Sequence, residues 1–294
     1  MLKGFEILIY RRKFGRGFRP HFSLKIDGID FHIDSSPGIG FNLITHAHTD
    51  HYGLRNMGNR KAVASKETAR ILETISGKRF RGITFNVGET IKVGGLKIKT
   101  FDTGHMHGST AFYFKDKGIL ITGDVKDFSS FPKCDLLITE ATYGHPAYVF
   151  EDEIDRVIRA AEEGRELGVY PVGKAQRVAE LLNENDIGFR TTEKIERICR
   201  ALGIDFQKGE AKLLPTREVR NGYILSAQKF YRNRIVLSDH IDYRGIIEMI
   251  SHCDPDYVLF YHGRAHWRLI EDVKGMGVTP LTLTEVVLKP MGVK

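Results

Sequence analysis

The densest group of side chains able to do chemistry is the run Thr45-His46-Ala47-His48-Thr49-Asp50-His51. Alternate residues of an extended chain point the same way, so His46 and His48 can face one centre. Asp50 and His51 then begin a turn or helix and can face a second centre. Imidazole nitrogen and carboxylate oxygen are ligands that Zn²⁺ accepts. Three histidines and one aspartate within six residues are not expected in an ordinary polar loop. The run therefore predicts a metal site.

More residues of ligand type follow apolar runs further along the chain, each beside a glycine. They are His105 after Gly104, Asp124 after Gly123, and His262 before Gly263. His107 is an alternative to His105. A single histidine after a strand is more often structural, but several such residues downstream of the first run favour a metal centre with two sites. Small neighbours let backbone and substrate approach the metal closely.

The elements that must position these residues are predicted from hydrophobic periodicity and turn signals. A helix is expected near Lys66–Ile75, with Ser65 as its N-cap. Short strands are expected at Glu6–Tyr10, Phe22–Ile26, Phe31–Ile33, Phe41–Ile44, Lys97–Phe101, Ala111–Phe114 and Ile119–Ile121.

The middle of the chain has a different pattern, with helices expected at Glu151–Glu163, Lys174–Asn183 and Thr192–Ala201. A strand–helix pattern returns with strands at Ile235–Leu237 and Tyr257–Phe260 and helices near Tyr243–Ser251 and Arg264–Lys274. We therefore predict one domain built from residues 1–144 and 234–294, interrupted by an insertion at 145–233.

The ordered set of motifs resembles the metallo-β-lactamase superfamily, and more closely its β-CASP branch of nucleic-acid nucleases. The run His46–His51, the later His105, the Gly-Asp124 pair and His262 carry the general resemblance. The finer resemblance is carried by Leu137–Gly144 (motif A), Pro171–Gln176, Ser238–Tyr243 (motif B) and Phe260–Gly263 (motif C). The resemblance implies an α/β fold, an αββα sandwich with a small inserted α/β cassette.

The resemblance also implies a role for each matching residue. His46, His48 and His105 would bind one zinc ion; Asp50, His51 and His262 would bind a second; and Asp124 would bridge the two. His105 is favoured over His107 because it matches the family's Gly-His. Asp34 would support a ligand from behind. His240 would contact the scissile phosphate or transfer a proton, and Glu140 would orient it. The catalytic residues would thus be Asp50, His240, Glu140 and Asp34.

Two departures from the branch bear on the substrate. The cassette at 145–233 is short, and Arg264 stands where relatives often have an acidic residue. The motif C histidine is typical of members that process RNA. The resemblance thus implies an endo- or exonuclease with RNA favoured over DNA. The alternatives are a DNA repair exonuclease, a small-molecule hydrolase of the same fold, and a non-catalytic nucleic-acid-binding subunit.

Charge and composition agree with an acidic partner. Lys and Arg exceed Asp and Glu by 44 to 37, a net charge of +7. The segment Tyr10–Pro20 interleaves cations with aromatics, so Arg11, Arg12, Lys13 and Arg16 are candidate phosphate-binding residues. A solvated hairpin tip is the alternative. No membrane partner is expected, because no apolar run approaches the ~20 residues of a membrane helix. A cytoplasmic location is the default expectation, and a homodimer is possible. Three other histidines, His21, His252 and His266, are expected to have no role in the site.

Overall fold

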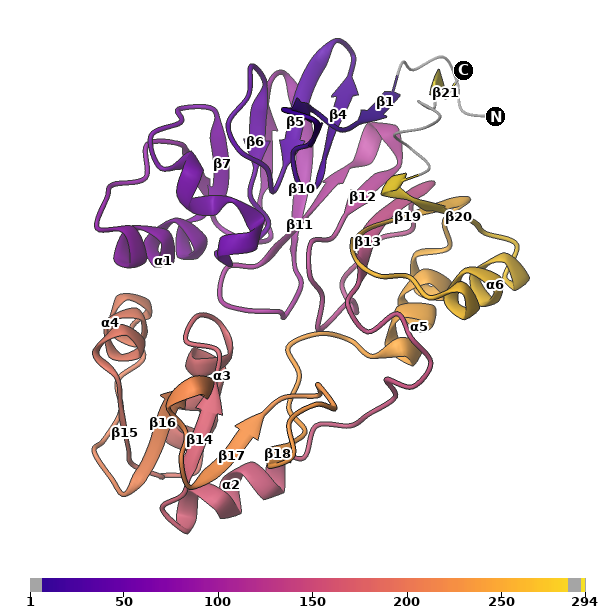
Figure 1. Cartoon of the computed structure of the whole chain (residues 1–294). Helices are drawn as coiled ribbons and strands as arrows, with labels where there is room; N and C mark the ends of the chain where they lie inside the picture. The colour runs from indigo at the N-terminus through magenta and orange to yellow at the C-terminus, as the bar shows by residue number, and fades with distance from the viewer. Residues whose placement is uncertain (1–6, 285–291, 294) are drawn as a thin grey trace.

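The structure is a computed structural model that describes residues 7–284 and 292–293, and the fold is mixed α/β, as predicted (Figure 1). Glu6 of the first expected strand and residues 285–291 and 294 of the expected domain lie outside the described residues. Two large sheets and one smaller sheet account for most of the strands.

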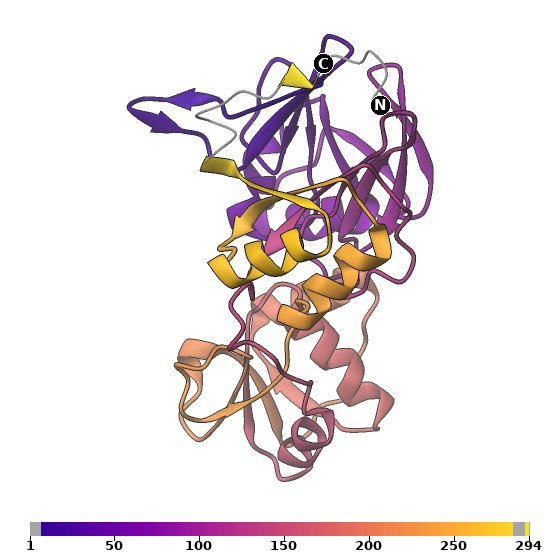
Figure 2. The same ribbon diagram turned by 90° about the vertical axis from the view of Figure 1, so that its right-hand side faces the viewer.

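The first large sheet has the strand order β21-β1-β4-β5-β6-β7-β8. Its strands are β1 (Ile7–Tyr10), β4 (Phe22–Ile26), β5 (Ile29–Ile33), β6 (Phe41–Leu43), β7 (Ala62–Ser65), β8 (Ile83–Phe85) and β21 (Gly292–Val293). From β5 to β8 neighbouring strands are parallel. The short strands β2 (Lys13–Phe14) and β3 (Gly17–Phe18) form a hairpin that projects from the body of the molecule (Figure 2).

The second large sheet has the order β20-β19-β13-β12-β11-β10-β9. Its strands are β9 (Thr90–Val93), β10 (Leu96–Asp102), β11 (Thr110–Phe114), β12 (Ile119–Ile121), β13 (Leu136–Ala141), β19 (Tyr257–Gly263) and β20 (Thr279–Thr282). The strands from β12 to β20 are parallel to one another. Their carboxyl ends therefore meet at one edge.

A continuous apolar core joins the two large sheets. Phe22, Leu24 and Phe31 of the first sheet belong to the same buried cluster as Phe112 and Ile138 of the second. The helix α1 (Lys66–Ser76) covers the other face of the first sheet through Ile71 and Leu72, beginning at the expected cap Ser65. The helices α5 (Tyr243–Cys253) and α6 (Trp267–Gly275) cover the outer face of the second. The layers run helix, sheet, sheet, helix.

The third sheet lies within the expected insertion and has a core of its own. Its order is β15-β16-β14-β17-β18, and every neighbouring pair is parallel. The strands are β14 (Glu166–Val169), β15 (Phe189–Thr191), β16 (Ala211–Pro215), β17 (Gly222–Leu225) and β18 (Arg234–Ile235). The helices are α2 (Ile154–Glu162), α3 (Lys174–Glu184) and α4 (Glu193–Leu202). From the sequence we expect the larger domain to resume at residue 234. Instead β18 pairs with β17, so Ile235 is part of the third sheet.

Charged side chains tie the insertion to the two large sheets. The carboxylate of Asp152 accepts hydrogen bonds from Lys126 after β12 and from Arg177 of α3, both at 2.8 Å. Arg177 also donates to Asp239, at 2.9 Å. Burial alone would raise the pKa of Asp152, but the hydrogen bonds from Lys126 and Arg177 hold it below its ordinary value. The network fixes the segment that carries His240.

We expect Arg177→Met to lower the free energy of unfolding by about 2 kcal/mol. Removing one partner of a buried pair costs ~3–5 kcal/mol, and the effect is smaller here because Arg177 remains 32% exposed. Arg200→Met is the matched control, since its pair with Glu196 on α4 is exposed and contributes roughly 0.5 kcal/mol or less. Urea unfolding of both variants measures the difference. Equal losses of stability would contradict the assigned role of Arg177.

Candidate metal centre

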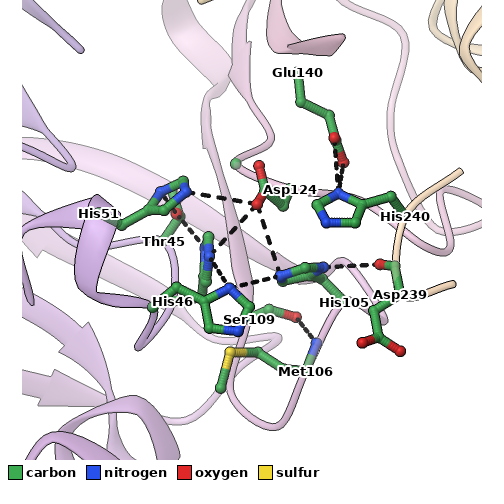
Figure 3. A network of polar contacts seen from close by, with 12 residues as sticks. Thr45, His46, His51, His105, Met106, Ser109, Asp124, Glu140, Asp239 and His240 are labelled. Carbon is green, nitrogen blue, oxygen red and sulfur yellow. Dashed lines mark hydrogen bonds and ion pairs between the residues drawn. The ribbon is translucent and has the colours of Figure 1, made fainter. Parts of the chain in front are cut away.

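The predicted ligands gather where strands of both large sheets end (Figure 3). His46 and His48 follow β6, His105 follows β10, Asp124 follows β12, and His262 lies near the end of β19. The described residues contain three groups of side chains whose ligand atoms lie within 4.8 Å of one another. The groups are His46 with His48, His105 and Asp124; Asp50 with His51 and His262; and Asp124 with Glu140 and His240.

In the first group three imidazoles turn one nitrogen each toward a common space. His48 Nδ1 lies 3.1 Å from His46 Nε2 and 3.3 Å from His105 Nε2. The Asp124 Oδ2 atom lies 3.6 Å from His46 Nε2 and 3.7 Å from His105 Nε2. His46, His105 and Asp124 are almost completely buried. Four potential ligand atoms therefore meet in a space largely closed to water.

The second nitrogen of each ring is held by a hydrogen-bond acceptor. His48 Nε2 donates to the carbonyl of Val172 at 2.9 Å, and His105 Nδ1 donates to the carbonyl of Asp239 at 2.8 Å. A neutral imidazole has one N–H, so the nitrogens facing the common space carry lone pairs. This tautomer is the one required of a metal ligand.

His46 reaches the same state through Thr45 and Asp34. The hydroxyl of Thr45 donates to Asp34 Oδ2 at 2.7 Å, so its oxygen accepts from His46 Nδ1 at 3.0 Å. His46 Nε2 therefore also carries a lone pair. Burial and then the neighbouring His51 lower the pKa of His46, so it stays neutral.

Negative charge completes the first group. Burial would raise the pKa of Asp124, but His51 beside it lowers the pKa well below the ordinary value. The Oδ1 atom of Asp124 is buried without a hydrogen-bond partner among the described residues. Three lone pairs and an ionised carboxylate repel one another unless a cation lies between them. The donor set therefore fits a borderline ion such as Zn²⁺.

The second group differs because His51 lies between two carboxylates. Its Nδ1 is 2.7 Å from Asp34 Oδ2, and its Nε2 is 3.5 Å from Asp124 Oδ2. Burial alone would lower the pKa of His51, but Asp34 and Asp124 raise it well above the ordinary value. A cation at Nε2 would have to replace a proton, the usual exchange when a metal binds. A cleft of about 660 Å³ opens beside this group and is lined by Asp50 and His262.

Asp34 lies beneath both groups and fixes their geometry. Besides Thr45 and His51, its carboxylate accepts from the hydroxyl of Tyr261 at 3.2 Å. The parallel pairing of β13 and β19 shifts register between Thr139 and Glu140, which leaves Tyr261 as the extra residue of a bulge. Tyr261 thus turns into the core between the sheets, while Glu140 pairs with His262. Bulges of this kind often redirect side chains beside functional sites.

His240 and Glu140 form a separate ion pair next to the first group (Figure 3). His240 Nδ1 lies 2.8 Å and 3.0 Å from the two oxygens of Glu140, which is fully buried. Burial alone would lower the pKa of His240, but the carboxylate of Glu140 raises it to about 9. The ring of His240 lies 4.6 Å from the ring of His105, measured between centroids. A protonated imidazole is therefore available beside the cluster.

His240 lies outside the first turn of helix α5. The helix α5 begins at Tyr243, and its N-cap is Asp242, whose carboxylate already accepts from Gly245 N–H at 2.8 Å. His240 lies before that cap, in a bend held by Ser238. His240 is therefore not part of the N-terminal turn of α5, whose N–H groups could otherwise bind a phosphate beside it.

The structure separates His105 from His107. His105 points into the cluster, whereas His107 Nε2 lies 3.0 Å from Glu180 of α3. The hydrogen bond that His107 donates to the carboxylate of Glu180 raises the pKa of His107. His107 thus links the loop after β10 to the insertion.

The basic residues of the β2–β3 hairpin do not act as one group. Arg12 turns inward and donates to Ser35 Oγ and to the carbonyl of Pro37, each at 3.0 Å, and to the carbonyl of Ser36. Arg11 lines the cleft of the second group. Lys13 and Arg16 are exposed on the projecting hairpin. Three of the four candidates can meet a ligand, while Arg12 supports the loop after β5.

Some contributors to the centre carried no usable signal in the sequence. His21, expected to have no role, stacks on His262 with ring centroids 5.5 Å apart and faces the carbonyl of Asp50 at 2.9 Å. The carbonyls of Val172 and Asp239 hold two of the cluster's imidazoles. His252, which faces the carbonyl of Phe131 at 2.9 Å, is not part of the three groups. Backbone acceptors cannot be recognised from residue types.

Comparison with known proteins gives weak similarity. No family model matches the chain. It is 24% identical over 277 residues to a probable DNA ligase from Opitutus terrae, covering 76% of this chain and 27% of that protein. It is 25% identical over 208 residues to RNase aCSPSF2 from Saccharolobus solfataricus, covering 55% of this chain and 42% of that protein. The chain thus spans less than half the length of both curated relatives.

A solved structure has a similar fold. The crystal structure of a protein of unknown function from Enterococcus faecalis V583 superposes with a TM-score of 0.66 and 12% identity, covering 94% of this chain and 97% of that one. At this identity the likeness concerns the fold alone. Separately, no helix in the described ranges has both the length and the apolar composition needed to cross a membrane.

We expect His105→Ala to lose metal and His107→Ala to retain it. Of these two histidines, only His105 contributes a ligand atom to the first group. Both variants remove one imidazole from the same loop, so His107→Ala is the matched control. Elemental analysis of the purified protein should give about two transition-metal ions per chain for the unmodified protein and for His107→Ala, as two-metal hydrolases contain. A metal content near zero in the unmodified protein, with no uptake of added zinc, would exclude the metal centre.

Proposed function

We propose that the chain is a two-zinc phosphodiesterase that hydrolyses nucleic acid, with RNA favoured over DNA. We further propose that it belongs to the β-CASP branch of the metallo-β-lactamase superfamily, whose αββα sandwich corresponds to the layers described above. The observation that carries the proposal is the convergence of three imidazole lone pairs on an ionised Asp124 beside a protonated His240. Such a donor set suits metal binding, and a neighbouring acid suits the departure of an oxygen leaving group.

The proposed ligands form two sites that share one carboxylate. His46, His48 and His105 would hold one ion, and Asp50, His51 and His262 the other. Asp124 would serve both, since it belongs to the first group and its Oδ2 lies 3.5 Å from His51 Nε2. Two bound ions supply positive charge for a phosphodiester and lower the pKa of water. Asp34, through Thr45 and His51, fixes the tautomers of ligands in both sites.

His240 is proposed to donate a proton to the leaving oxygen or to a phosphate oxygen. Its pKa of about 9 keeps it protonated near neutral pH, and its side chain is 20% exposed, so a substrate can reach it. Glu140 orients the ring through Nδ1 and leaves Nε2 as the free donor. This division resembles other acid–base pairs in which a buried carboxylate positions an imidazole.

The insertion favours a polymeric substrate over a small one. The carbonyl of Val172 fixes His48, and a side chain at Gly173 would come within 3.2 Å of His48 Nε2, so the insertion forms part of the centre. The chain has a net charge of +7 and an exposed basic hairpin. A non-catalytic subunit would not need the complete set of ligands together with His240.

The names of the two relatives favour different nucleic acids as the substrate. The name of the relative from Saccharolobus solfataricus supports RNA cleavage, as does the histidine of motif C, His262. The name of the relative from Opitutus terrae favours action on DNA as the second candidate. A cytoplasmic location and a homodimer remain predictions.

The test is cleavage of end-labelled single-stranded RNA and DNA of one sequence, assayed side by side. We expect metal-dependent cleavage that a chelator abolishes and that zinc restores, faster on RNA. Asp124→Ala should abolish it while the far-ultraviolet circular dichroism stays unchanged, because the shared carboxylate serves both ions. Full activity in this variant would show that the proposed ligand set is wrong, and faster cleavage of DNA would favour the second candidate.

We expect His240→Ala to retain both metal ions and to lower turnover on polynucleotide by roughly 10²–10⁴-fold, the range for a positioned acid. A small activated phosphodiester, whose leaving group needs no proton, should be affected much less. Metal analysis of the same preparation is the control for an intact centre. The acid role is falsified if turnover on polynucleotide is unchanged, or if both substrates slow equally with the metal retained.

A further inference from the structure

Two loops meet just beyond the metal centre, at the carboxyl ends of β13 and β19. Backbone hydrogen bonds join them: Arg264 N–H donates to the carbonyl of Ala141 and His266 N–H to that of Gly144, both at 3.1 Å. The strands themselves pair Glu140 with His262. These loops therefore begin within a few residues of Glu140 and His262 along the chain.

These loops present an exposed group that we name the aromatic–cation surface: His145, Arg264, His266, Trp267 and Arg268. The rings of His145 and His266 lie 4.3 Å apart between centroids, and those of His266 and Trp267 lie 5.4 Å apart. The guanidinium of Arg268 lies 4.4 Å from the centroid of Trp267. Trp267 is the only tryptophan of the chain and is 58% exposed. A large exposed aromatic ring among cations indicates a ligand surface.

The arginines of this surface are not held in ion pairs with described residues, although Asp272 of α6 lies four residues after Arg268. Arg264 and Arg268 have no ion pair with an acidic side chain in the described part of the chain. The acidic residues of α6 are engaged elsewhere, since Glu271 pairs with Lys274 at 3.0 Å and Asp272 accepts from Tyr243 at 2.5 Å. Burial is the first cause that lowers the pKa of His266, and the nearby basic side chains of His145, Arg264 and Arg268 lower it further.

A second exposed aromatic extends the surface toward the third sheet. Lys229 donates to the carbonyl of Ala147 at 2.6 Å and lies 5.7 Å from the ring centroid of Tyr148. The next residue, Phe230, is 71% exposed. Cations and aromatic rings thus continue from the β19 end of the centre to the insertion.

We propose that the aromatic–cation surface is a stacking subsite for single-stranded nucleic acid, occupied by nucleotides that extend away from the metal centre. The inference rests on the proposed function. Unpaired bases can stack on Trp267 and the histidine rings, and Arg264 and Arg268 can contact the phosphates. A duplex keeps its bases stacked inside the helix and cannot use such rings in the same way. The subsite gives a reason for a basic residue at Arg264, where related enzymes often have an acidic one.

The test uses the fluorescence of Trp267, which reports this surface alone because the chain has no other tryptophan. The unmodified protein is titrated with cleavage-resistant phosphorothioate oligomers of uridine and of thymidine, roughly 12 nucleotides long, within the ~4–16 of known single-strand sites. We expect saturable quenching by the single strands, and little quenching by a duplex of equal length. The two arms compare RNA with DNA. Equal quenching by duplex, or none by either single strand, would overturn the subsite.

Variants separate stacking from charge, with binding followed by anisotropy of labelled oligomer. Trp267→Ala should weaken binding about tenfold, and Trp267→Phe should retain most of the affinity, as expected for base stacking. Arg264→Ala with Arg268→Ala should flatten the slope of log affinity against log salt by about 1.4, since each phosphate contact on a single strand contributes ~0.7. The double variant Lys78→Ala with Arg79→Ala removes the same charge from an exposed loop after α1. Equal effects in the two double variants would overturn the subsite.

The outcomes also distinguish this inference from the proposed function. Cleavage of single strands without quenching of Trp267 would overturn the subsite and leave the phosphodiesterase intact. Quenching and the expected variant effects without metal-dependent cleavage would support the subsite as a binding surface and overturn the proposed function.

Discussion

Three imidazole lone pairs and the carboxylate of Asp124 are held against one another in a space largely closed to water. His46, His48 and His105 cannot relieve this repulsion by turning, because each ring is fixed through its second nitrogen. A buried, uncompensated set of electron pairs is costly unless a cation is bound. The need to bind a cation here explains why each ring has an acceptor behind it. It also explains why several elements of the fold meet at this point.

Those acceptors come from separate parts of the chain, which makes the centre a product of the whole fold. Thr45 and Asp34 belong to the first sheet, Val172 to the insertion, and Asp239 to the segment that returns from it. The insertion therefore cannot be a passive lid. Its position is fixed by the hydrogen bond from Lys126 to Asp152 and by the packing of α4 against α1.

His240 shows how the same region can hold an acid next to a group of neutral imidazoles. Its neighbour His105 has a pKa lowered to about 3, first by burial and then by the charge of His240. His240 itself is protonated because Glu140 is buried behind it with both oxygens in reach. Two histidines with ring centroids 4.6 Å apart thus have opposite protonation preferences, set by the carboxylate that one of them contacts.

The sequence by itself determined the chemical identities and the local elements. The spacing of His46, His48, Asp50 and His51 after an apolar run predicted the cluster, and the helices α1, α3 and α5 begin where the periodicity and caps placed them. The strands β14 to β17 were not located, because short runs within a helix-rich segment have little periodicity of their own.

The sequence favoured His105 over His107, and the structure sets His105 in the cluster and His107 beside Glu180. Only the tertiary structure brought His21 beside His262 and turned Arg12 inward. It also assigned β18 to the third sheet and set His240 against the carboxylate of Glu140. The reason is physical: a sequence fixes which groups are present and how near neighbours alternate. Acceptors from distant parts of the chain, many of them backbone carbonyls, decide which nitrogen of an imidazole keeps its proton. They also decide which basic side chains form hydrogen bonds within the protein and which remain exposed.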